Sequence, residues 1–418
     1  MSWAHRMLSP GSSYEMAPIS PNTAHEGVWC KSRCSGSGRA TCGLHLSLRR
    51  FTRGREGKLG WKSQAKHMQW HPGFEPALCT TSSATVFPSS SRQFLTGHYW
   101  ALFDGHGGPD AAIIASNYLH YCIKQKLEEI VGGITEAQPP MHLSGRCVCD
   151  SDPQFVEEKH IHAADLVVGA LENAFQECDE VIGQEMEATN QSGGCTALAA
   201  LYFQGKLYVA NAGDSRAILV LKDSIVPMSS EFTPESERQR IQHLAFVFPK
   251  LLDGEFTRFE FPRRLKGDDA PHPDISILFC FVWGQARLLG TLAVSRGLGD
   301  HQLKVIDTNI EVKPFLSCIP KVNVFDFALH DIKEDDVLIM ATDGLWDVLC
   351  NDEVAHVVRS FLAENRTDPQ RFLELAKCLV CRARGKKRGH QWMLDDSHEA
   401  SYDDISVFVI PLHNREED

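Results

Sequence analysis

Short apolar runs of strand length recur along the chain from residue 99 onward. The run that begins at Leu207 follows the run that ends at Phe203 after only Gln204-Gly205-Lys206. Two β-prone runs across so short a connection predict a hairpin. The predicted strands are 99–103, 196–203, 207–211, 217–221, 337–341 and 405–410.

Longer segments with apolar residues at helical spacing lie between these runs and tend to come in pairs. Pro109 suits the first position of a helix, and Leu166, Ala170 and Leu171 repeat at the spacing of one helical face. The predicted helices cover 109–127, 162–186, 235–244, 352–363 and 368–383. Strands in hairpins and helices in pairs favour an α+β fold, with antiparallel sheets covered by helices rather than a parallel βαβ sheet.

Residues 1–95 have a different character from the rest of the chain. They are rich in Ser, Gly, Pro and Arg and show no sustained periodicity, which predicts a disordered or loosely ordered basic segment. We expect residues 96–413 to form one domain with a flap-like insertion at about 230–285. Residues 275–283 are apolar for a solvent-facing flap, and they predict either a new strand or a short replacement for a longer polar loop.

Charge is distributed unevenly along the chain. Residues 1–100 hold 12 basic and 4 acidic side chains, whereas the whole chain holds 42 and 54. A basic tail can bind nucleic acid or an acidic membrane, but here the basic residues are scattered, as in a solvated segment. The acidic remainder argues against a nucleic-acid-binding protein and suits a site built from carboxylates.

Neither a membrane segment nor a metal-binding cysteine pattern stands out. The longest apolar stretch, 275–283, is too short to cross a bilayer, and the N-terminus lacks the apolar core of a secretory signal. The 14 cysteines are scattered through apolar segments, which is typical of buried reduced thiols. Cys378 and Cys381 form a CxxC without a second pair nearby, and such a pair indicates zinc only weakly.

Three aspartates stand at the edges of very apolar strands. Asp104 follows Ala-Leu-Phe, Asp343 follows Leu-Ile-Met-Ala-Thr, and Asp403 precedes Ile-Ser-Val-Phe-Val-Ile. Taken singly, each can be a turn residue, because Asp-Gly is a common turn dipeptide. Taken together with Asp214, four carboxylates at strand ends call for a compensating cation, and oxygen ligands favour Mg²⁺ or Mn²⁺ over zinc.

The two residues after Asp104 add to this picture. Gly105 lets the backbone approach a cation closely, so that its carbonyl can also coordinate. His106 is two residues from a metal ligand, and a histidine can have a pKa near working pH. His106 is therefore a candidate general acid.

Six ordered motifs then resemble a known family. Phe103-Asp104-Gly105-His106-Gly107-Gly108 looks like the signature of the metal-dependent protein phosphatases, also called the protein phosphatase 2C type. The other motifs, in the family's order, are Ser192–Ala197, Ala210–Arg216, Leu292–Asp300, Ala341–Asp347 and Tyr402–Val407. The sequence between these motifs is similar to that of the subgroup labelled H, J and M, and most similar to that of its M member.

The resemblance implies a fold, a reaction and a set of ligands. The fold would be two packed antiparallel sheets flanked by helix pairs. The chain would be a Mg²⁺- or Mn²⁺-dependent protein serine/threonine phosphatase that uses a metal-activated water. Its partners would be phosphorylated proteins, with no nucleic acid or membrane, and it would be a monomer of the cytoplasm, with the nucleus as a second location.

The resemblance also implies a role for each site residue. Asp104 would bridge two metals, with the Gly105 carbonyl on one of them, and Asp343 and Asp403 would hold the other. Asp214 and Asp347, with Asp343, match a weaker third metal position. His106 would protonate the leaving alkoxide. The small-residue segments Ser192–Ala197 and Ser295–Gly299 and the Ser215-Arg216 pair are interpreted as structural supports.

One part of the family pattern is missing. The family has an Arg that grips substrate phosphate and a Glu-Asp pair on an early strand, whereas residues 1–100 contain no aspartate. Glu56 is a poor replacement because its Gly-Arg-Glu-Gly setting is not strand-like. We therefore expect the first strands of the sandwich to be missing, which would leave one edge of a sheet exposed. The alternative function is a catalytically weak or inactive binding protein with a phosphatase fold.

Overall fold

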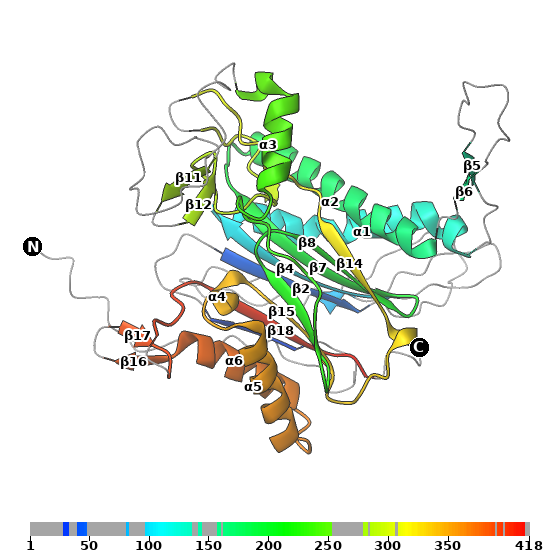
Figure 1. Ribbon diagram of the computed structural model, residues 1–418, viewed down its shortest axis with the longest axis vertical. Coiled ribbons are helices and arrows are strands. Elements are labelled where there is room, and N and C mark those ends of the chain that lie inside the picture. The colour runs from blue at the N-terminus through cyan, green and yellow to red at the C-terminus, as the bar shows by residue number, and fades with distance from the viewer. Residues whose placement is uncertain are drawn as a thin grey trace, which may run out of the picture.

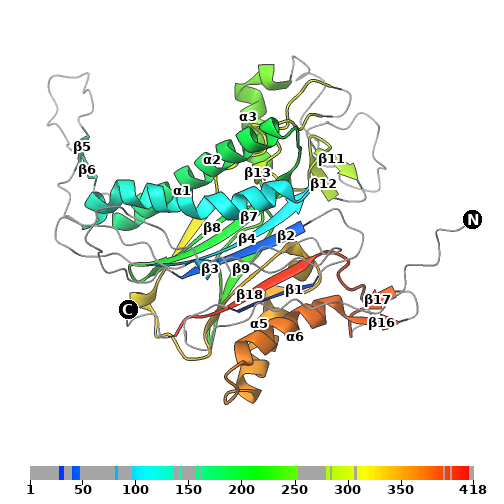
Figure 2. The ribbon, with the colours of Figure 1, turned by 180° about the vertical axis from the view of Figure 1, so that it is seen from behind.

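The computed structural model describes residues 28–32, 40–47, 81–82, 97–135, 141–143, 157–159, 162–252, 279–282, 285–305, 308–388, 391–395 and 398–413. Two antiparallel sheets pack face to face, and a pair of helices covers the outer face of each (Figure 1). Figure 2 shows the same four layers from behind. The expected sandwich of two sheets between helix pairs is confirmed.

The first sheet has the strand order β14-β8-β7-β4-β2-β3, and β13 pairs with β7. All its pairs are antiparallel except the one between β2 and β3. The bounds are β2 Ala40–Ser47, β3 Thr81–Ser82, β4 Gly97–His106, β7 Gly194–Phe203, β8 Lys206–Ala212, β13 Leu298–Gly299 and β14 Lys321–Asp326. Its long central strands β4 and β7 carry the segments expected to hold the site.

The second sheet has the strand order β1-β18-β15-β9-β10, and all its pairs are antiparallel. The bounds are β1 Val28–Ser32, β9 Arg216–Val220, β10 Ile225–Pro227, β15 Val337–Ala341 and β18 Ile405–Pro411. The chain crosses from the first sheet to the second between β8 and β9, at residues 213–215. Asp214 therefore lies at a crossover.

Strand β4 shows why the predicted strands consist of consecutive apolar residues. Tyr99, Ala101 and Phe103 belong to the core under helices α1 and α2, whereas Trp100 and Leu102 belong to the core between the two sheets. Successive side chains point to opposite faces, and here both faces are covered. Each apolar residue of β4 is therefore buried, whichever face of the sheet it is on.

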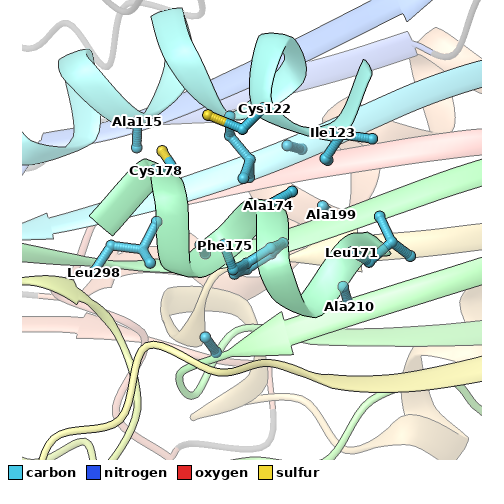
Figure 3. Close-up of a cluster of buried hydrophobic side chains, with 14 of the residues drawn as sticks. Ala115, Cys122, Ile123, Leu171, Ala174, Phe175, Cys178, Ala199, Ala210 and Leu298 are labelled. Carbon is cyan, nitrogen blue, oxygen red and sulfur yellow. The ribbon is translucent and has the colours of Figure 1, made fainter. Parts of the chain in front are cut away.

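Helices α1 (Asp110–Thr135) and α2 (Ala163–Ala188) cover the first sheet. Figure 3 shows the core where they meet, with Phe175 reaching toward the strands and Cys122 and Cys178 facing each other across the helix pair. Helix α1 extends eight residues beyond the expected end at Leu127, because Ile130, Val131 and Ile134 pack against the same core.

Helices α5 (Asn351–Glu364) and α6 (Arg371–Arg384) cover the second sheet, and their apolar faces share a core with β15 and β18. Helix α5 begins where Glu353 Oε2 accepts a hydrogen bond from the Cys350 N–H at 2.8 Å. Helix α6 ends at Gly385, whose φ of 65° suits glycine at a helix C-terminus. Both helices lie within three residues of the predicted bounds.

The insertion holds helix α3 (Arg238–Val247), the 3₁₀ turn η1 (Pro249–Leu252) and a hairpin of β11 (Phe279–Val282) and β12 (Gln285–Leu288). It has its own small core, which includes Ile241, Leu288 and Phe315. Of the two expectations for the apolar stretch, the new strand is the one observed. The remaining elements are β5 Met141–Leu143, β6 Glu157–Lys159, η3 Phe327–Leu329, α4 Asp343–Trp346, β16 Lys386–Arg388 and β17 Gln391–Met393.

The expected loss of the first strands is wrong. Strand β1 pairs with β18 over five residues, and β2 pairs with β4 over eight, so both sheets have a strand at the suspected open edge. The sequence pattern predicted no strand in residues 1–95, and the rest of that segment lies outside the described residues. Across the described part of the chain, no helix has the length and hydropathy needed to span a membrane.

Candidate metal and active site

A pocket opens where strands of the two sheets end beside the insertion. Its volume is about 130 Å³, enough for a phosphate group and several waters. It brings together Asp104, His106, Asp214 and Asp343, which come from segments up to 239 residues apart in sequence. The full lining is Asp104, Gly105, His106, Thr196, Asp214, Arg287, Leu292, Ala293, Val294 and Asp343.

Asp104, Gly105 and His106 form the last three residues of β4 and lie beside β7. The chain turns after them through Gly107 and Gly108, whose φ angles of 72° and 137° favour glycine. A Cβ on Gly107 would approach the Gly193 Cα to 3.1 Å. Glycine at positions 107 and 193 therefore allows the two backbones to approach closely after β4, which agrees with the interpretation of Ser192–Ala197 as a structural support.

Asp214 is placed by a buried asparagine. Asn211 Nδ2 donates hydrogen bonds to the carbonyls of Gly213, Ser215 and Ser230 at 3.2, 3.0 and 2.8 Å, which fixes the crossover. Burial, reinforced by the negative charge of Asp347, raises the pKa of Asp214 to about 6. Burial of the Asp214 carboxylate makes its charge costly, and a bound cation would relieve that cost.

Asp343 and Asp403 lie at one end of the second sheet. Strands β15 and β18 are antiparallel with Ala341 opposite Val407, so the residues after the first and before the second are neighbours. Thr342 links the two segments, because its hydroxyl donates to the Asp404 carbonyl at 3.3 Å and accepts from the Ser406 N–H at 3.0 Å. Asp343 lines the pocket, whereas Asp403 and Asp347 are not among the lining residues.

The loops around Asp403 and Asp347 are held by arginines. Arg384 Nη2 donates to the Asp403 carbonyl at 2.8 Å, and its Nη1 donates to the Ser401 carbonyl at 2.8 Å. Arg216 pairs with Glu231, donates to Asn351 Oδ1 at 2.8 Å and lies 5.0 Å over the Trp346 ring. Arg216 thereby connects β9 to the α4 turn that carries Asp343, as a structural support does.

His106 has a partner that the sequence did not reveal. Its Nε2 lies 2.6 Å from Oδ2 of Asp300, a side chain that is 2% exposed. Asp300 adopts a φ of 57°, and its N–H donates to the Gly193 carbonyl at 2.8 Å. The only sequence signal for Asp300 was its position at the end of the Leu292–Asp300 motif. Its contact with His106 depends on the fold.

The loop that carries Asp300 is anchored to helix α2. Asp179 Oδ1 accepts from the Gly299 N–H at 2.7 Å, and its Oδ2 lies 2.6 Å from Lys313 Nζ. Burial alone would raise the pKa of Asp179, but His301 and Lys313 outweigh it and leave the pKa below its ordinary value. A buried carboxylate therefore fixes the backbone next to Asp300.

Strand β2 occupies the place beside the Asp-Gly-His segment. In the register of the pair, Thr41 is opposite Asp104 and Ala40 is opposite Gly105. The strand reads Ala-Thr-Cys-Gly-Leu-His-Leu-Ser and contains neither arginine nor acid. The strand that is expected to be missing is thus present, but without the side chains that the family pattern has upstream of this motif.

The pocket residues fit a hard cation by the chemistry of their donors. Carboxylate oxygens of Asp104, Asp214 and Asp343, with the Gly105 carbonyl, are the donor types of magnesium and manganese sites. Among the described residues, no three acidic, histidine or cysteine side chains are grouped closely enough to hold a metal ion by themselves.

The chain is similar in sequence to a known protein family and to several of its members. Residues 142–260 and 275–388 match the sequence model of the family described as Protein phosphatase 2C. Protein phosphatase 1M of Homo sapiens is 60% identical over 344 residues, covering 78% of this chain and 74% of that protein. Protein phosphatase 1H of Xenopus tropicalis is 45% identical, with coverages of 77% and 72%.

A further relative and a solved structure complete the comparison. Protein phosphatase 1J of Homo sapiens is 43% identical over 360 residues, covering 77% of this chain and 70% of that protein. The crystal structure of a serine-threonine phosphatase 2C from Toxoplasma gondii is 17% identical, covers 75% of this chain and 85% of that chain, and has a TM-score of 0.43.

Proposed function

The chain belongs to the protein phosphatase 2C family, and we propose that it hydrolyses phosphoserine and phosphothreonine in proteins with Mg²⁺ or Mn²⁺. Its relatives are of the H, J and M kinds, with the M kind at 60% identity, as the motifs indicated. The observation that supports the reaction is the convergence of Asp104, Asp214, Asp343 and His106 on one pocket.

The proposed metal ligands lie at or near strand ends, except Asp347, which follows helix α4. The Asp104 carboxylate and the Gly105 carbonyl would hold one cation, and Asp104, Asp343 and Asp403 would hold a second. Asp214, Asp343 and Asp347 would form a weaker third position, which agrees with the effect of Asp347 on the Asp214 pKa. Bound divalent cations supply hydroxide at neutral pH and neutralise charge on phosphoryl oxygens.

His106 is the proposed proton donor to the leaving alkoxide. Asp300 takes up Nε2, so Nδ1 is the ring nitrogen left for proton transfer. A proton donor at Nδ1 must carry a proton on both ring nitrogens, and the Asp300 carboxylate that fixes the ring's orientation is a suitable partner for the Nε2–H group. The apolar side chains of Leu292, Ala293 and Val294 form one wall of the pocket and limit the water around the reacting phosphate.

A second candidate function is supported by one observation. Strand β2 lies beside Asp104 and has neither arginine nor acid within residues 40–47, so these described residues lack part of the family's substrate-binding and metal-supporting machinery. The chain would then be a weak or inactive phosphatase-fold protein that binds phosphorylated partners. The three pocket carboxylates and the His106–Asp300 pair favour an active enzyme.

The deciding experiment is hydrolysis of a phosphothreonine peptide by the full chain with and without Mn²⁺. We expect metal-dependent turnover that is lost in Asp343→Asn, since the amide removes the charge that holds the cation. Asp352→Asn, an exposed acid on α5, is the matched control and should behave as wild type. Wild-type protein without metal-dependent turnover would refute the proposed enzyme activity of this chain.

A further inference from the structure

Arg287 brings a positive charge to a pocket that is otherwise rich in carboxylates. It lies on β12, in the insertion, and lines the pocket together with Asp104, Asp214 and Asp343. Among the described residues of the lining, Arg287 is the only side chain with a permanent positive charge. An arginine here faces the volume in which a substrate phosphate would lie.

A tight turn fixes the backbone next to Arg287. The Leu288 N–H donates to the Leu292 carbonyl at 2.7 Å, and the Gly290 N–H donates to the Arg287 carbonyl at 3.2 Å. Leu289 and Gly290 have φ angles of 48° and 73°, as a sharp reversal of the chain requires. The chain therefore reverses its direction immediately after Arg287.

The neighbours of Arg287 also hold it in place. Leu288 and Leu289 are buried in the small core of the insertion. On its other side, β11 pairs with β12 so that Cys280 is opposite Arg287. The apolar strand β11 therefore pairs with the strand that carries the arginine.

The guanidinium is oriented but its charge is not neutralised by an acid. Arg287 Nη1 donates to the Thr291 carbonyl at 3.0 Å, which directs the side chain. Within the described part of the chain, Arg287 forms no ion pair, whereas the nearby Arg240 and Arg296 both pair with Glu237. Those two arginines serve the structure, and Arg287 keeps most of its five donors for another partner.

We propose that Arg287 binds the phosphate of the substrate, in place of the arginine that β2 lacks. The inference rests on the proposed phosphatase function and names the residue that holds the dianion. A guanidinium offers paired N–H donors that match two phosphate oxygens, and such contacts to a charged group are strong. This placement moves phosphate recognition from the sheet edge to the insertion.

The test compares Arg287→Gln and Arg287→Lys with wild type in the full chain with Mn²⁺. One measurement is kinetic, with KM, kcat and the inhibition constant of inorganic phosphate. The other is binding, by fluorescence anisotropy, of a peptide that carries a non-hydrolysable phosphonate analogue of phosphothreonine. Arg366→Gln is the matched control, because Arg366 is 71% exposed beyond the end of α5, in the opposite helix layer.

We expect Arg287→Gln to raise KM and the phosphate inhibition constant about tenfold or more, with kcat changed less than about threefold. The affinity for the phosphonate peptide should fall by a similar factor. Arg287→Lys should recover part of this affinity, because lysine restores the positive charge but not the paired N–H donors of the guanidinium. Arg366→Gln should match wild type. An unchanged thermal midpoint for Arg287→Gln shows that the effect is not misfolding.

Two results would overturn the inference. One is phosphonate-peptide affinity and a phosphate inhibition constant within twofold of wild type in Arg287→Gln. The other is a wild-type protein that does not distinguish the phosphonate peptide from its unmodified form. If wild type binds the phosphonate peptide through Arg287 but shows no turnover, the phosphatase proposal fails while the assignment of Arg287 stands.

Discussion

His106 and Asp300 form a pair 194 residues apart in sequence, with Nε2 of the histidine 2.6 Å from Oδ2 of the aspartate. The pair joins the end of β4 to the loop after β13, and the side chain of Asp300 is 2% exposed. A carboxylate so placed can hold the imidazole ring in one orientation. Asp300 is thus a positioning residue for the proposed general acid.

Replacing Asp300 should affect substrates according to their leaving groups. A serine or threonine alkoxide must be protonated as it leaves, whereas p-nitrophenolate is stable without a proton. We expect Asp300→Asn to lower kcat for a phosphothreonine peptide by about 10² and to lower kcat for p-nitrophenyl phosphate by much less. Asp331→Asn, at an exposed acid, is the control.

The double variant Asp300→Asn/His106→Gln tests whether the two residues act together. If Asp300 acts only through His106, the double variant should be no slower than His106→Gln alone. Equal loss on both substrates in Asp300→Asn would instead assign Asp300 a purely structural role.

Gly194 should not tolerate a methyl group. A Cβ at this position would overlap Asp300 Oδ2 and lie 2.8 Å from His106 Nε2. We expect Gly194→Ala to abolish most phosphopeptide turnover and to lower the free energy of unfolding by about 1–3 kcal/mol. Gly169→Ala, on α2 with nothing within 4 Å of its added Cβ, should keep activity and gain about 0.5–1 kcal/mol. Normal turnover in Gly194→Ala would contradict the packing of the pair.

His120 should make the fold sensitive to mild acid. Burial lowers its pKa to about 4, and a hydrogen bond to the Ser116 backbone offsets this only in part. Between pH 6.5 and 4 the unfolded chain therefore binds a proton that the folded chain does not, so stability falls as pH falls. The loss from His120 between pH 7 and pH 5 should be about 2 kcal/mol.

Chemical denaturation of wild type and two variants at pH 7 and pH 5 measures this contribution. His120→Gln should lose less stability than wild type over the same pH step. His356→Gln removes an exposed histidine of α5 and should keep the full loss. An equal pH dependence in wild type and His120→Gln would show that other groups cause it.

Asp179 should contribute stability at neutral pH that is lost only in strong acid. Its folded pKa is below the ordinary value of 3.8, so its contribution is present above that pH and disappears as pH falls through the folded pKa. At pH 7 we expect Asp179→Asn to cost about 3 kcal/mol, because Lys313 loses a buried partner.

The same variant separates stability from catalysis. An asparagine at position 179 retains an oxygen for the Gly299 N–H, so turnover at low temperature should fall much less than stability. Asp331→Asn, whose acid is 83% exposed, should leave the free energy of unfolding unchanged. A stable Asp179→Asn protein would contradict the importance of this buried pair.

The sequence predicted the parts of the fold whose cause is local. Trp100 and Phe103 lie on opposite faces of one strand and are both buried, so the apolar run by itself predicted the strand. Strands β1 and β2 gave no such pattern. Their places depend on the open edges of β18 and β4, which are contacts with distant residues that a local pattern does not encode.

The site was predictable to the same extent. Asp104 and Asp343 stood out because a carboxylate beside an apolar strand needs a reason, and the structure brings both to one pocket. Asp300 and Arg287 matter only through neighbours that the fold supplies, so neither could be assigned a role from its own surroundings. Several statements stay predictions, namely the domain boundary at residue 96, the cytoplasmic or nuclear location, the catalytic role of His106, and the ligand roles of Asp104, Gly105, Asp214, Asp343, Asp347 and Asp403.

The crossover at residues 213–215 has a consequence for how activity reports on folding. Asp104 comes from the first sheet, Asp343 from the second, and Asp214 from the connection between them. Two polypeptides divided at this connection would each contain only part of the carboxylate set. Turnover by such a mixture would therefore report the docking of the two layers, which a measure of secondary structure content does not.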